Sequence, residues 1–219
     1  KGETIVRNIA EGSHPVYGIN TGFGPLCTTR ISPGATSQLQ VNILKSHSVG
    51  VGPLLEPELV RLMLVLKIQS LAQGYSGIRE TTLDRILWHL EEDVLPKVPS
   101  QGSVGASGDL APLAHLFLPL IGLGRVRYQG SVKPAAAVLE AHQLSPLELG
   151  PKEGLALING TPAMTALLAK AVLETRSLVR IADLLGALSA DALRATLCRT
   201  TIKDLGYSWK EVQSWSDDV

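Results

Sequence analysis

An unbroken helical pattern runs from Pro162 to about Thr196, and it constrains the fold more than any other feature of the sequence. Its apolar positions fall on one stripe, made of Leu167, Ala171, Leu178, Ile181, Leu185 and Leu188. The average helix in a globular protein has roughly 11–12 residues, so this one is expected to be unusually long. Such helices are typical of large bundles, which predicts a mainly α architecture.

Shorter helical patterns precede this run and support the same architecture. Aromatic residues make up only 4% of the sequence while leucine and alanine are plentiful, which favours packed helices over sheets. Apolar spacing predicts helices over 37–47, from Glu56 onward, and over 82–93, 109–122, 135–142 and 152–158. The helix from Glu56 is apolar nearly all round, as buried helices are. Glycine-rich 16–24 is predicted as a loop, and 124–132 as a small hairpin or an irregular excursion. Asp109 is expected to cap the helix that follows it.

The charged residues and cysteines argue against several functional classes. Lys plus Arg and Asp plus Glu number 20 each, and no basic stripe is present, so we expect neither a nucleic-acid partner nor a membrane partner. Cys27 and Cys198 form no CxxC pair, and His14, His89, His115 and His142 have no metal-binding spacing. We therefore expect no disulfide framework and no catalytic metal, and we interpret these four histidines as structural or exposed. A reducing, cytoplasmic location is expected.

The loop 101–110, QGSVGASGDL, is the segment most informative about chemistry. It lacks the lysine of a P-loop, and its glycines do not have the spacing of a dinucleotide-binding turn after a strand. It also differs from the GxSxG turn of hydrolases, because Asp109 stands where the second glycine would be. What is left is Ala-Ser-Gly among small residues.

Small residues let backbone atoms approach one another closely. The backbone nitrogen of Gly108 can attack the carbonyl carbon of Ala106, and loss of one water from the new ring and one from the Ser107 side chain leaves an electron-poor ring. The tripeptide alone fits a glycine-rich entry into a helix better than this chemistry. The rest of the sequence is needed to choose between the two.

Four segments in order carry a family resemblance: VYGINTGFG at 16–24, LQVNILKSHSVGVG at 39–52, GSVGASGDLAPLAHL at 102–116 and KEGLALINGT at 152–161. Together they resemble the histidine and aromatic amino-acid ammonia-lyases, and the histidine-specific members most. The resemblance covers about 16–196. It implies that Ala106, Ser107 and Gly108 cyclise into 4-methylidene-imidazole-5-one (MIO), an electrophile that ordinary side chains cannot supply.

The resemblance also implies roles for single residues. Tyr17 matches a tyrosine of the family that takes part in proton transfer, and Asn159 matches an asparagine that contacts MIO and substrate. Ser46 and His47 occupy the position that reads the substrate, where histidine-specific members resemble Ser-His. An imidazole at His47 can hydrogen-bond another imidazole. Without the family context, Tyr17 and His47 would be interpreted as packing residues and Asn159-Gly160 as a turn.

The implied fold is the mainly α, helical-bundle fold of the ammonia-lyases and fumarases, with a loop-rich region that carries MIO. The implied function is a carbon–nitrogen lyase that converts L-histidine to urocanate and ammonia, as a homotetramer. We expect 1–196 to be part of the family's catalytic region and 197–219 to be a tail unlike it, so that the chain is part of a longer protein. Pro162 stands where the family usually has glutamine.

Two alternatives stay open at this point. One is a phenylalanine or tyrosine ammonia-lyase or aminomutase of the same family. The other is an inactive helical piece that acts only in oligomerisation, which predicts exposed apolar helix faces.

Overall fold

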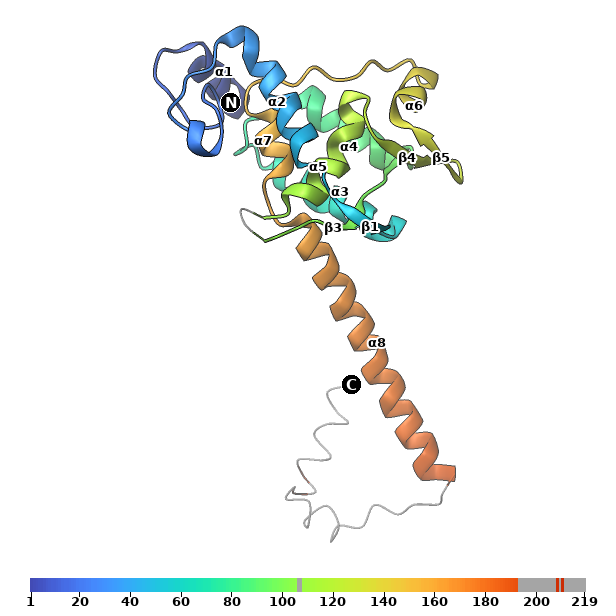
Figure 1. Cartoon of the computed structure of the whole chain (residues 1–219). Helices are drawn as coiled ribbons and strands as arrows, with labels where there is room; N and C mark the ends of the chain where they lie inside the picture. The colour runs from blue at the N-terminus through green and yellow to red at the C-terminus, as the bar shows by residue number, and fades with distance from the viewer. Residues whose placement is uncertain (106–107, 193–207, 209, 211–219) are drawn as a thin grey trace. The chain divides into compact units, whose positions relative to one another are not determined.

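The structure, a computed structural model, describes residues 1–105, 108–192, 208 and 210 (Figure 1). The chain divides into two compact units, Lys1–Lys170 and Ala171–Val219. The first unit contains all the named helices and strands apart from the C-terminal part of the last helix, α8. The site predicted from the sequence falls entirely in this first unit.

Helices dominate the described residues. They are α1 (Gly2–Glu11), α2 (Pro33–His47), α3 (Pro57–Ala72), α4 (Glu80–Glu91), α5 (Leu110–Phe117), α6 (Ala135–Ala141), α7 (Glu153–Ile158) and α8 (Pro162–Ala192), with 3-10 turns at η1 (Gly24–Leu26) and η2 (Leu118–Ile121). The predicted mainly α architecture is confirmed.

Proline begins three of these helices. Pro33, Pro57 and Pro162 are the first residues of α2, α3 and α8. At this position proline loses nothing, because the first amide of a helix has no partner within the helix and the ring already holds a helical φ. Local sequence therefore sets where these helices begin.

Five short strands form two small sheets among the described residues. β1 (Val51–Leu54) pairs antiparallel with β3 (Pro99–Gln101). In the second sheet β4 (Arg125–Tyr128) lies between β2 (Leu95–Pro96) and β5 (Ser131–Pro134), again with antiparallel pairing. The predicted hairpin at 124–132 is confirmed as β4 and β5, whereas β1, β2 and β3 were not predicted, since strands this short carry little periodicity.

The main hydrophobic core lies around α3 and α5. From these helices it takes Leu59, Val60, Met63, Leu64, Leu71, Leu113, Ala114, Leu116 and Phe117. α2, α4 and α7 add Ile43, Leu44, Ile86, Leu157 and Ile158. The prediction that the helix from Glu56 is buried is confirmed only for part of its surface: Leu59, Val60, Met63, Leu64, Lys67 and Leu71 are buried, whereas Glu58, Val65, Gln69, Ser70 and Ala72 are exposed.

The other predicted helices are confirmed with shifts of a few residues at their ends. The pattern over 109–122 divides into α5 and η2, and Gly122 ends η2 with a left-handed φ of 75°. The loop at 16–24 is confirmed as turns that run into η1. Helix α1 was not predicted from the sequence.

Helix α8 is the long helix expected from the sequence. Its first turn is packed, with Ala163 and Ala166 buried in the core. Beyond it the large apolar side chains of the predicted stripe are exposed: Leu167, Leu178, Ile181, Leu185 and Leu188. The predicted end near Thr196 and most of the predicted tail at 197–219 lie outside the described residues.

Candidate functional site

The predicted electrophile precursor lies against the segment that contains Asn159. Gly108 forms a parallel bridge with Gly160, and the Asp109 amide donates to the Gly160 carbonyl at 2.8 Å. A Cβ at Gly108 would lie 2.1 Å from the Gly160 oxygen, and φ of Gly108 is +95°, so only glycine fits there. Ala106 and Ser107 lie outside the described residues.

The segment that follows His47 runs beside the segment that leads into the precursor. Val51 in β1 pairs with Gln101 in β3, and a Cβ at Gly102 would lie 2.9 Å from the Gly50 Cα. The Gly50 amide donates to His115 Nε2 of α5 at 3.0 Å. Partial burial lowers the pKa of His115, which keeps this nitrogen available as an acceptor.

The predicted tyrosine loop packs on the helix that ends at Asn159. Gly18 has a φ of +72°, and a Cβ there would lie 2.3 Å from a methyl carbon of Leu155 in α7. The Asn159 amide donates to the Leu155 carbonyl at 3.0 Å. Tyr17 itself is 53% exposed and contacts Phe23 edge-to-face, with 6.2 Å between the ring centres. About half of the Tyr17 residue is therefore open to solvent.

Ser46 and His47 form the C-terminal end of α2. His47 Nδ1 lies 2.9 Å from the Ile43 carbonyl oxygen and 3.0 Å from Ser46 Oγ. A carbonyl oxygen only accepts, so the neutral ring carries its proton on Nδ1. The free lone pair of His47 is then on Nε2.

Helices α2 and α7 approach closely, which places these motifs in one region. A Cβ at Gly154 would lie 2.5 Å from the Gln40 carbonyl oxygen, and Gln40 Oε1 accepts from the Leu155 amide at 3.2 Å. The precursor loop, the segment after His47, the loop of Tyr17 and Asn159 are thus neighbours. The catalytic and binding roles of these residues stay predictions.

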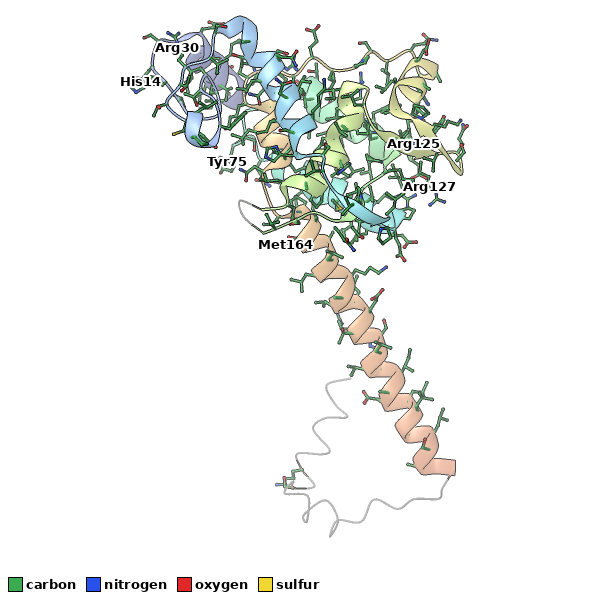
Figure 2. The ribbon with its side chains drawn as sticks, viewed as in Figure 1. His14, Arg30, Tyr75, Arg125, Arg127 and Met164 are labelled. Atoms are coloured by element: carbon green, nitrogen blue, oxygen red, sulfur yellow. The ribbon has the colours of Figure 1, made fainter. Side chains whose placement is uncertain are left out.

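Asp109 differs from the prediction made for it. It occupies the N-cap position of α5, but its side chain makes no capping hydrogen bond there. Its buried carboxylate instead accepts from the Met164 amide in the first turn of α8 at 3.0 Å and from Ser103 Oγ at 3.4 Å (Met164 is labelled in Figure 2). The predicted N-cap position is therefore confirmed, but the side-chain capping hydrogen bond is not formed, because tertiary packing brings the positive end of another helix to this carboxylate.

Lys67 is a residue of this region that the sequence interpretation missed. It lies in α3, is 2% exposed, and donates from Nζ to the Asn159 carbonyl at 2.6 Å. Burial lowers its pKa to about 8. One signal was available: Lys67 stands four residues from both Met63 and Leu71, on an otherwise apolar helix face.

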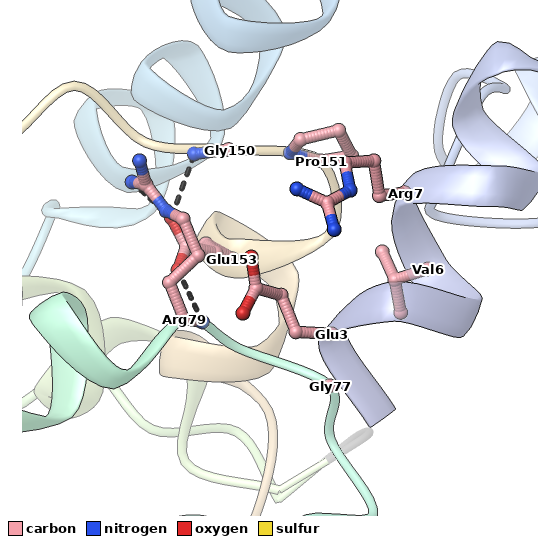
Figure 3. Close-up of a pocket in the computed structure, with 8 residues that line it drawn as sticks. All are labelled: Glu3, Val6, Arg7, Gly77, Arg79, Gly150, Pro151 and Glu153. Atoms are coloured by element: carbon pink, nitrogen blue, oxygen red, sulfur yellow. Dashed lines mark hydrogen bonds and ion pairs between the residues drawn. The ribbon is translucent and has the colours of Figure 1, made fainter. Parts of the chain in front are cut away.

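A buried ion pair holds the opposite end of α7. Glu153 accepts from the Arg79 side chain at 2.6 Å and from the Gly150 amide at 2.6 Å (Figure 3). It also accepts from Thr82 Oγ1 at 2.7 Å. Burial by itself raises the pKa of Glu153, but the hydrogen bonds from Arg79, Thr82 and backbone amides outweigh it and leave the pKa lowered. A small cavity of about 70 Å³ next to this pair is lined mainly by α1 and the pair itself, so it belongs to the packing of α7.

Two features are absent from the described part of the chain. No group of three or more His, Cys, Asp or Glu side chains is arranged to hold a metal ion there. Nor is any of its helices both long enough and apolar enough to cross a membrane.

Comparisons with known proteins agree with this arrangement. The family described as "Aromatic amino acid lyase" matches residues 1–201. Histidine ammonia-lyase of Deinococcus radiodurans is 51% identical over 192 residues, covering 88% of this chain and 37% of that protein. The same enzyme of Sorangium cellulosum is 53% identical over 178 residues, covering 81% and 35%.

Solved structures give the same result. The crystal structure of histidine ammonia-lyase from Trypanosoma cruzi superposes with a TM-score of 0.82 at 42% identity, over 89% of this chain and 38% of that one. Tyrosine aminomutase from Streptomyces globisporus gives a TM-score of 0.71 at 41% identity, over 76% and 31%. The chain spans 35–37% of the length of the two bacterial relatives. With a family match over residues 1–201, the chain belongs to the aromatic amino acid lyase family.

Proposed function

We propose that this chain carries part of the active site of a histidine ammonia-lyase, a carbon–nitrogen lyase that converts L-histidine to urocanate and ammonia. The observation that carries the proposal is the backbone bridge between Gly108 and Gly160, the residue next to Asn159. The bacterial relatives at 51% and 53% identity are named histidine ammonia-lyases, which supports histidine as the substrate.

The described residues around the precursor fit MIO. Ring closure needs the Gly108 nitrogen near the Ala106 carbonyl carbon, which is favoured by a backbone without a Cβ at Gly108 and with φ of +70° at Gly105. MIO supplies an electrophilic carbon. Ala106, Ser107 and Gly108 would form it, and Asn159, whose side-chain amide both donates and accepts hydrogen bonds, would hold it and the substrate.

Recognition of histidine follows from the tautomer of His47. With the proton of Nδ1 directed to the Ile43 carbonyl, Nε2 can accept from an imidazole N–H of the substrate. A site built to pair a ring nitrogen discriminates against phenyl rings, because its own polar group would otherwise stay unpaired. Ser46 keeps the His47 ring in place through its Oγ contact.

Proton transfer is assigned to Tyr17. Its ring is held by Phe23, while its hydroxyl belongs to an exposed side chain that a bound substrate can reach. A phenol oxygen that has first given up its own proton can take a proton from a carbon atom and later release it.

The first test is the mass of the peptide 105–109 from the purified chain. We expect a mass lower by two waters in the wild type and the full mass in Ser107→Ala, which lacks the hydroxyl that leaves. The full mass in the wild type would contradict MIO formation in this chain.

The second test is deamination, measured as urocanate formation by the chain supplied with the remaining part of the protein. His47→Leu is expected to lower kcat/KM for histidine by roughly 100-fold, because at least one polar contact to the substrate is lost. A β-amino acid as the product would instead support the aminomutase alternative.

We also propose that the chain works in the cytoplasm as a homo-oligomer, a tetramer as in the family. The exposed apolar side chains of α8, among them Leu173, Leu178 and Leu184, support a second copy as their partner. Sedimentation should show association that rises with protein concentration, and a monomer at all concentrations would contradict it.

A further inference from the structure

Lys67 is a charged residue at a place where an apolar residue would fit. Its neighbours one turn away on α3, Met63 and Leu71, are buried in the core. Removal of an ammonium group from water is costly, and an apolar side chain of similar volume would avoid that cost. The amine must therefore make a contact that an apolar side chain cannot make.

That contact is with the backbone of the site. Lys67 Nζ donates to the Asn159 carbonyl at 2.6 Å, across 92 residues of sequence. Nζ also lies 3.6 Å from the position of a Cβ on Gly160. Although burial lowers the pKa of Lys67 to about 8, the amine still carries its charge at neutral pH, which strengthens the hydrogen bond.

The segment that Lys67 contacts, Asn159–Gly160, is the one that Gly108 of the precursor packs against. Gly160 accepts from the Asp109 amide at 2.8 Å and bridges to Gly108. A continuous set of contacts therefore links Lys67 of α3 to Asn159, and Gly160 to Gly108. A shift of the Asn159–Gly160 peptide would move both the Asn159 side chain and the support of Gly108.

We propose that Lys67 is a positioning residue for the reaction: its ammonium group holds the Asn159–Gly160 peptide against Gly108 and Asp109. This inference rests on the proposed function for its consequence, the yield of MIO. The effect of Lys67 on the hydrogen bond between the Asp109 amide and the Gly160 carbonyl can be measured whether or not MIO forms.

The experiment compares Lys67→Met and Lys67→Arg in the full chain with Arg61→Met as the control. Arg61 is an exposed cation on the same helix, paired with Asp93, so its removal tests loss of charge from α3 alone. Two quantities are measured: hydrogen exchange of the Asp109 amide relative to the core amide of Leu64, and the fraction of the 105–109 peptide that has lost two waters.

In Lys67→Met we expect Asp109 exchange to accelerate roughly tenfold beyond that of Leu64, because a charge-assisted hydrogen bond behind Gly160 is lost. The cyclised fraction should fall with it. Lys67→Arg should restore part of both, and Arg61→Met should match the wild type. A general loss of stability would accelerate Asp109 and Leu64 equally.

The proposal is overturned if Lys67→Met leaves both readouts at wild-type values, if Asp109 and Leu64 accelerate equally, or if Lys67→Arg restores nothing. If the wild type loses no water, MIO formation fails in this chain, while Asp109 exchange still decides the role of Lys67. If Lys67→Met does not fold, Lys67→Gln takes its place with the same readouts.

Discussion

Helices α3 and α8 are both rich in leucine and valine, yet their environments differ. In α3 the apolar side chains fill the core, and Met63 and Leu64 are almost inaccessible to water. In the part of α8 that belongs to the second unit, Leu173, Leu178 and Leu184 are exposed by 60% or more. A periodic apolar pattern therefore predicts a helix in both places, but burial depends on which elements pack against it.

The largest effect is expected from the same truncation made in each helix. Leu64→Ala in α3 should lower the free energy of unfolding by roughly 3–5 kcal/mol, because it leaves a cavity in a packed core. Leu184→Ala in α8 should change it by less than about 0.5 kcal/mol in the monomer. Urea unfolding of dilute protein measures both, and equal effects would show that α8 is as firmly packed as α3.

A second contrast uses pH. Burial lowers the pKa of His89 in α4 to about 4, against an ordinary 6.5, although its Nδ1 pairs with the Val94 carbonyl. Between these values the unfolded chain binds the proton that the folded chain excludes, so stability falls as pH decreases from 6.5 toward 4. The loss should reach up to about 3 kcal/mol.

The measurement for His89 is the free energy of unfolding between pH 7 and 5. His89→Gln should have a shallower slope than the wild type, with the residual slope due partly to His115, whose pKa is also lowered by burial. An unchanged slope would exclude His89 as its source. No histidine lies in the second unit, so its unfolding should not share this dependence.

A smaller effect is expected from the ion pair that anchors α7 within the packed unit. Glu153→Gln should lower the free energy of unfolding by about 2 kcal/mol near neutral pH, because the Glu153 carboxylate is buried. The partial exposure of Arg79 keeps the effect from being larger. Glu56→Gln, at an exposed pair with Lys170, is the matched control and should have little effect. Because the folded pKa of Glu153 is lowered, the difference from wild type should shrink as pH falls below 4.5.

The smallest effect on stability is expected from Leu185→Glu in α8. An exposed side chain tolerates a charge, so the free energy of unfolding of the monomer should change by less than about 0.5 kcal/mol. If a second copy covers this face, association should weaken at least roughly tenfold. Sedimentation at several protein concentrations measures this association. Unaltered association would show that the contact between copies does not involve Leu185.

All the helices except α1, and the precursor loop, were predictable because their signals are local. Prolines mark the beginnings of α2, α3 and α8, and glycines with positive φ, such as Gly108, are needed where no Cβ fits. The strands β1 and β3 were missed because they are short. Each is stabilised by the other, although β3 starts at Pro99, 48 residues after the start of β1 at Val51. Pairing of that kind leaves no periodic pattern in either segment.

The site divides in the same way. By itself the sequence determined the helical architecture, the Ala-Ser-Gly precursor and the residues Tyr17, Ser46, His47 and Asn159 as candidates, since all of these depend on short stretches of chain. Only the tertiary structure decided that Asp109 binds the first turn of α8 rather than capping α5, and that Lys67 reaches the Asn159 carbonyl. Both contacts join residues more than 50 positions apart, and a hydrogen bond between distant segments exists only once packing has brought donor and acceptor together.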